Sequence, residues 1–84
     1  MWILKNYRLM QKIEEIGLLL DRRRREQRYS VAEIARETGC SRPALNDLFS
    51  GKNSTIKIIL AVCDTLNMKM MLVDKGKGIY HEED

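Results

Sequence analysis

The side chains that most often perform covalent or metal chemistry are scarce in this sequence of 84 residues. It contains two cysteines, Cys40 and Cys63, and one histidine, His81. The cysteines form no CxxC pair, so a zinc site would have too few ligands. Cys63 falls in an apolar helical pattern, which predicts a small buried hydrophobe, and His81 lies in an acidic, solvated tail. We therefore predict no metal site and no cofactor.

Catalytic sequence motifs are absent as well. The chain has no HExxH, no GxSxG and no glycine-rich loop that could cradle a phosphate, which argues against an enzyme. No apolar run approaches the roughly 20 residues of a membrane span. No signal peptide is evident at the start, so we expect a cytoplasmic protein without a membrane partner.

Charge is unevenly distributed along the chain. Residues 1–58 contain 12 Lys or Arg against 7 Asp or Glu, whereas residues 59–84 contain 3 against 5. A basic front suggests a surface that faces a polyanion. On a helix, the four side chains of the run Arg22–Arg25 point in four directions, so they cannot all contact one partner. A solvated face, anchoring of a DNA backbone and contact with an acidic protein stay open for this run.

Helical periodicity and capping residues predict the first two elements. Apolar residues at spacings of three and four predict a helix over residues 5–27. Ser30 and Glu33 form a capping box that begins a second, short helix, with Tyr29 packing against it. Gly39 is placed to end that helix in the left-handed conformation.

A third helix follows almost at once. Ser41 is its predicted N-cap, and Pro43 in the first turn removes only an amide without an intrahelical partner. Two short helices joined by the three-residue turn 39–41 are the core of a helix-turn-helix. In that arrangement the first helix braces the second, whose N-terminal residues reach base edges in the major groove.

A fourth helix is predicted from Thr55 to Leu66, capped by Asn53 or Ser54. Its predicted apolar face is Ile56, Ile59, Leu60, Cys63 and Leu66. Alternating residues then predict a short strand over 68–74. A lone strand leaves its amides unpaired, so we expect the same strand of a second copy to pair with it. The predicted dimerisation residues are Met68, Met70 and Leu72.

The segment from Ser30 to Gly51 resembles the Cro/repressor-type (XRE) helix-turn-helix family. The matching residues are Glu33, Ile34, Ala35, Gly39, Leu45, Leu48 and Gly51. Residues 53–74 resemble the end of HipB-like antitoxins, in which strands of two subunits pair across the dimer axis. The resemblance implies a mainly α, lambda-repressor-like bundle of four to five helices with a short C-terminal strand pairing across a dimer.

The implied organisation has four parts. They are an N-terminal extension at 1–11, a helix-turn-helix DNA-binding domain at 12–67, a dimerisation strand at 68–74 and a flexible tail at 75–84. Two positions depart from the family. Val31 replaces a glutamine that often helps hold a phosphate, and Phe49 replaces a glutamate that pairs with an arginine at about Arg24. We expect Phe49 to contribute burial instead.

The resemblance also implies which residues contact DNA. The base contacts are Arg42, Pro43, Ala44, Asn46 and Asp47, and the phosphate contacts are Ser41, Lys52, Asn53 and Arg25. Arg42 is the expected base reader, because a guanidinium can grip guanine O6 and N7 together. Asp47 is repelled by phosphates, so we expect it to orient Arg42 or to accept a hydrogen bond from cytosine N4.

The implied function is sequence-specific repression of transcription by a homodimer bound to double-stranded DNA at an inverted-repeat operator. The resemblance of residues 53–74 further implies an autoregulating antitoxin with a cognate toxin protein as partner. Two alternatives stay open. One is a phage- or plasmid-type repressor without a toxin, and the other is a protein-interaction module on a helix-turn-helix fold.

Overall fold

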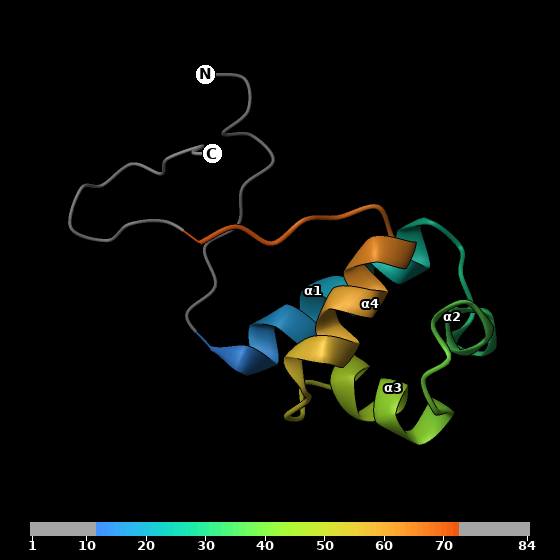
Figure 1. Cartoon of the computed structure of the whole chain (residues 1–84), viewed down its shortest axis with the longest axis horizontal. Coiled ribbons are helices and arrows are strands. Elements are labelled where there is room, and N and C mark those ends of the chain that lie inside the picture. Colours follow the sequence, from blue (N-terminus) through green and yellow to red (C-terminus); the bar gives the residue numbers. More distant parts are fainter. Residues whose placement is uncertain (1–11, 73–84) are drawn as a thin grey trace, which may run out of the picture.

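Four helices make up the part of the chain that the computed structural model describes, residues 12–72. They are α1 (Ile13–Glu26), α2 (Val31–Thr38), α3 (Arg42–Phe49) and α4 (Ile56–Thr65). In Figure 1, α4 lies in front of α1 and above α3, and α2 is seen nearly end-on beside them. The helix predicted over 5–27 is confirmed from residue 13 onward, and residues 5–11 lie outside the described range. None of the described helices is long and apolar enough to cross a membrane.

One hydrophobic core joins the four helices. α1 packs on α3 and α4, and α2 packs on the same two helices. The buried side chains are Leu20, Ile34, Leu45, Leu48, Phe49, Ile59, Val62, Cys63 and Leu66. Cys63 is 5% exposed, which confirms it as a small buried hydrophobe. Phe49 is also buried, as its position in the predicted third helix indicated.

The predicted capping box at the start of α2 is confirmed. The Ser30 hydroxyl accepts a hydrogen bond from the Glu33 amide at 3.0 Å, and the Glu33 carboxylate accepts one from the Ser30 amide at 2.7 Å. The hydrogen bonds with Ser30 hold the pKa of the Glu33 carboxyl below its ordinary value. Gly39 ends the helix with φ +78°, a conformation that glycine adopts without strain.

The starts of α3 and α4 differ in how well the sequence predicted them. Ser41 caps α3 as predicted, accepting from the Ala44 amide at 3.2 Å. The predicted cap of α4 at Asn53 or Ser54 is wrong, because the Thr55 hydroxyl accepts from the Ile58 amide at 3.3 Å. The Ser54 hydroxyl is buried without a hydrogen-bond partner among the described residues, so it does not serve the amides of α4.

The strand predicted over 68–74 is not observed in its described part. Residues 68–72 form neither helix nor strand, and residues 73–74 lie outside the described range. The Met68 amide donates to the Cys63 carbonyl at 2.8 Å, and the Met68 side chain packs partly against the core. Met68 therefore closes the end of α4. A strand also requires a paired neighbour, and none of residues 12–72 forms a strand that could pair with it.

The predicted apolar face of α4 is wrong at two positions. Ile56 and Leu60 are 59% and 50% exposed, whereas Val62, which the prediction left out, is fully buried. α4 is apolar on nearly all sides, so its sequence alone does not indicate which side meets the core.

α1 and α3 cross in close contact at Gly17. A Cβ added at Gly17 would overlap the backbone carbonyl oxygen of Leu48, far inside van der Waals contact. Backbone atoms cannot rotate away as a flexible side chain can, so α3 would have to move. Only glycine at this position permits the observed packing of α1 on α3.

We predict that Gly17→Ala lowers the free energy of unfolding by about 3 kcal/mol, although alanine favours helix. Gly39→Ala is the matched control, because nothing lies within 4 Å of an added Cβ there. That control should cost only the left-handed backbone penalty of about 1 kcal/mol. Urea unfolding followed by circular dichroism measures both. A Gly17→Ala variant as stable as the unsubstituted protein would contradict this account of the crossing.

Candidate nucleic-acid interface

The outer face of α3 carries the side chains predicted to contact bases. Arg42, Pro43, Asn46 and Asp47 are exposed, and they follow one another at helical spacing on one side of the helix. Ala44 differs, because it is half-buried and faces the start of α4. The opposite side of α3 is held in the core. The fold therefore presents four of the five predicted side chains together and sets the fifth at the edge.

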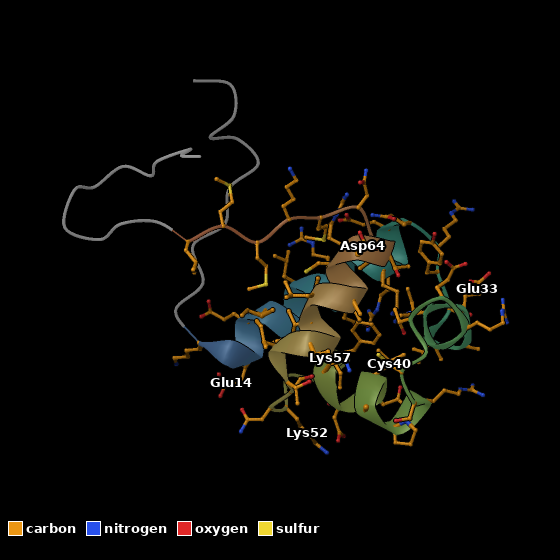
Figure 2. All side chains as sticks on the ribbon, in the orientation of Figure 1. Glu14, Glu33, Cys40, Lys52, Lys57 and Asp64 are labelled. Atoms are coloured by element: carbon orange, nitrogen blue, oxygen red, sulfur yellow. The ribbon has the colours of Figure 1, made fainter. Side chains whose placement is uncertain are left out.

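The turn between α2 and α3 is fixed by hydrogen bonds. The Thr38 hydroxyl donates to the Ile34 carbonyl at 2.7 Å and accepts from the Cys40 amide at 3.1 Å. Figure 2 shows Cys40 in this turn, where its half-buried side chain packs against the core. α2 thus braces α3 through both the core and the turn. Both cysteines are free thiols, and burial raises the pKa of Cys63.

Asp47 pairs with Lys52 at the C-terminal end of α3. Its carboxylate lies 3.7 Å from the Lys52 ammonium, and its carbonyl accepts from the Lys52 amide at 2.9 Å. The expectation that Asp47 orients Arg42 is not met, because Arg42 forms no ion pair with any residue in the range 12–72. The Asp47–Lys52 pair is well exposed, so water and salt weaken it.

A shallow hollow of about 350 Å³ lies between α3 and the start of α4. Its lining residues are Ala44, Asp47, Asn53, Ser54, Thr55 and Ile58. The N-terminal end of α4 adjoins this hollow and carries a partial positive charge that favours an anion. The structure thus brings Asn53 and Lys52 to one end of α3, whereas Ser41 caps the other end.

The run Arg22–Arg25 is paired within α1. Arg22 and Arg23 contact Glu26 at 3.6 and 2.8 Å, and Arg24 and Arg25 both contact Asp21 at 2.7 Å. Two carboxylates therefore offset much of the charge of four arginines. Arg25, a predicted phosphate contact, is 72% exposed but lies on α1, where Asp21 holds it.

Arg24 is the one largely buried member of the run, with 15% of its side chain exposed. Besides Asp21, it donates to the Tyr29 carbonyl at 2.8 Å, and its guanidinium lies 5.2 Å from the centre of the Phe49 ring. Asp21 thus supplies the carboxylate that many family members place at position 49. The Phe49 ring adds a cation–π contact and burial. Val31, the other departure, packs against the core.

The sequence analysis missed two roles, the ion pairs of Asp21 and the cap that Thr55 provides for α4. The spacing of Asp21 three and four residues before Arg24 and Arg25 was a usable signal, because such residues are neighbours on a helix. A hydroxyl directly before the apolar run was the signal for Thr55. Within residues 12–72, no group of three or more His, Cys, Asp or Glu side chains could hold a metal ion.

The sequence pattern of the helix-turn-helix domain matches residues 15–72. The chain belongs to the helix-turn-helix family. The match indicates a role in DNA binding and transcriptional regulation. Members of this family typically have no catalytic activity. It confirms the helix-turn-helix domain, whereas the Cro/repressor type and the HipB-like subgroup stay predictions. Among curated proteins, no match was found for this helix-turn-helix protein.

We predict that Arg24→Ala lowers the free energy of unfolding by about 2–4 kcal/mol, because it leaves a largely buried carboxylate with one exposed partner. Arg25→Ala is the matched control, since it removes the same group from the same Asp21. It should cost less than about 0.5 kcal/mol because Arg25 is exposed. Thermal unfolding compares the two. Equal losses would mean that the contacts of Arg24 with Tyr29 and Phe49 contribute nothing.

Proposed function

We propose that this protein is a homodimeric, sequence-specific transcriptional repressor that acts in the cytoplasm and binds an inverted-repeat operator. The observation that carries the proposal is the outer face of α3, where Arg42 and Asn46 are exposed. Within residues 12–72 Arg42 forms no ion pair, and the Asn46 side chain forms no hydrogen bond. A guanidinium reads guanine, and a carboxamide reads adenine, through paired hydrogen bonds. In this proposal the exposed Pro43 meets a thymine methyl group, and the half-buried Ala44 lies at the edge of the same contact.

Backbone contacts complete the proposed interface. Lys52 and Asn53 follow α3 directly and lie beside the hollow at the start of α4, where helix amides and a lysine both favour a phosphate. Ser41 supports the other end of α3 as its cap. In this proposal Arg25 contributes charge to the approach of DNA rather than a fixed contact, because Asp21 holds it.

The proposal includes a dimer because an inverted repeat has two half-sites and each needs its own copy of α3. A two-fold axis would place two copies of α3 about 34 Å apart, one turn of DNA, so that each reads one half-site. The predicted contact through Met68, Met70 and Leu72 would use exposed apolar residues beyond α4, since Met70 is 41% and Leu72 is 95% exposed. Met68 supports this contact less, because it packs against its own core.

An antitoxin role rests on the resemblance of residues 53–74 alone. A toxin gene beside this one would favour it, and the absence of such a gene would favour a phage- or plasmid-type repressor. The alternative of a protein-interaction module was suggested by Val31 and Asp47. Lys52 offsets the charge of Asp47 in the structure, which lowers the repulsion that a phosphate would meet there.

Selection from a random pool of duplexes at physiological salt tests the function directly. We expect an inverted repeat with half-sites about one helical turn apart. A salt titration on the selected duplex should show a linear fall of log K with log salt, about 0.9 for each phosphate contact. If the selection enriches no sequence, and salt abolishes the binding of every duplex alike, the protein-interaction module would be favoured.

Arg42→Ala should weaken binding to the selected site by about 1–3 kcal/mol and relax the preference at one base pair. Lys52→Ala should weaken all duplexes alike and lower the salt slope by about 1. Lys69→Ala removes the same charge from the exposed segment after α4, on the side away from α3, and should change neither property. Unchanged base preference in Arg42→Ala would mean that Arg42 does not read a base.

A further inference from the structure

α4 exposes apolar side chains that the domain does not cover. Ile56 is 59% and Leu60 is 50% exposed. Each lies two residues from Ile58, and a helix turns about 100° per residue, so both lie on the side of α4 opposite Ile58. Ile58 lines the hollow beside α3. The exposed apolar side of α4 therefore faces away from the recognition helix.

α1 adds a third uncovered apolar side chain. Leu18 is 53% exposed, and its Cγ would lie 3.6 Å from a Cβ added at Gly51, in the loop that leads to α4. α1 packs directly against α4. Ile56 and Leu60, which share one side of α4, are the more informative pair, because contiguous exposed apolar side chains mark contact sites more often than isolated ones do.

The charges on α4 are arranged with opposite signs at its two ends. Lys57 and Asp64 are the only charged residues of this helix, and both are exposed. Neither forms an ion pair with another residue of the range 12–72. Figure 2 shows them at opposite ends of α4. With Leu60 between them, spacings of three and four place all three on the same side of the helix.

This arrangement is self-complementary under a two-fold axis. If two copies of α4 pack antiparallel about a point between Leu60 and Ala61, Lys57 of each copy lies opposite Asp64 of the other. The two residues are about 10 Å apart along one helix, so both ion pairs form at once. The contact surface of a symmetric dimer must complement itself in this way. A surface that binds an unrelated partner does not need to be self-complementary.

We propose that a second copy of this chain docks on the outer side of α4, with Leu60 at the centre and reciprocal Lys57–Asp64 ion pairs at the edges. This inference depends on the homodimer of the proposed function, and it places the dimer contact on α4 instead of at Met68, Met70 and Leu72. Ile56 extends the apolar contact, and α3 stays outside it, because α3 lies on the Ile58 side of α4. The contact thus leaves both recognition helices free for DNA.

Sedimentation equilibrium of the full chain tests the apolar centre. Leu60→Ser should raise the dimer dissociation constant at least about tenfold, because two exposed leucines lose their burial. Met71→Ser is the matched control, since Met71 is 48% exposed and lies off α4, and it should leave the dissociation constant unchanged. Circular dichroism melts confirm folding. A monomeric natural chain, or an unaltered Leu60→Ser dimer, overturns the contact.

Charge exchange tests the orientation of the two helices. Lys57→Asp and Asp64→Lys should each raise the dissociation constant roughly threefold or more, because like charges then face each other. The double variant exchanges both signs and should restore the dimer. Each change also agrees with the helix dipole, which favours a negative charge near the N-terminal end and a positive charge near the C-terminal end. α4 should therefore stay folded. A double variant as weak as the two single variants combined overturns the antiparallel arrangement.

Two further measurements separate this contact from its rivals. If Met70→Lys dissociates the dimer and Leu60→Ser does not, strand pairing over 68–74 replaces the α4 contact. A duplex with one half-site reports on α3 alone, so Leu60→Ser should bind it with the same affinity as the natural chain. On a duplex with two half-sites, the variant should lose the increase in affinity that the second half-site provides. A chain that dimerises through α4 but binds no duplex would overturn the proposed function and keep the contact.

Discussion

The placement of α3 depends on the absence of a side chain at Gly17. The Leu48 carbonyl occupies the space that a Cβ at that position would need, so α1 and α3 touch backbone to backbone. Leu45 and Leu48 can then reach the centre of the core. Because protein interiors are close-packed, a shift of α3 at this crossing would disturb the burial of these side chains. The direction of its exposed face follows from that crossing.

Arg24 holds the same two helices together by different chemistry. Its guanidinium meets the Asp21 carboxylate, the Tyr29 carbonyl and the Phe49 ring, which belong to α1, to the loop before α2 and to α3. A largely buried cation is stable when it is paired and hydrogen-bonded, and Arg24 donates two hydrogen bonds to Asp21 and one to Tyr29. Gly17 and Arg24 both lie on α1, so the geometry of the helix-turn-helix depends on a helix outside the motif.

Local interactions were predictable from the sequence, and choices among near-equivalent residues were not. The cap at Ser41 involves residues three apart, so the chain order specifies it. Three consecutive residues could have capped α4, and the start of the helix was therefore placed too early. The contact of Asp47 with Lys52 depends on how the chain turns after α3, which spacing along a helix does not describe. Burial on α4 depends on its neighbours, since Ile56 and Val62 are similar residues with opposite exposure.

The Asp47–Lys52 ion pair bears on how such a protein would search a genome. A lysine that already has a carboxylate beside it gains less from an arbitrary phosphate, because Asp47 repels that phosphate. In the proposed complex, residence on unrelated sequence would therefore be shortened at this corner of the interface. A base pair that offers an amino group to Asp47 would satisfy the carboxylate. Asp47, and not Lys52, would then increase the contrast between sites, because its repulsion lowers affinity for every duplex but least for the matching one.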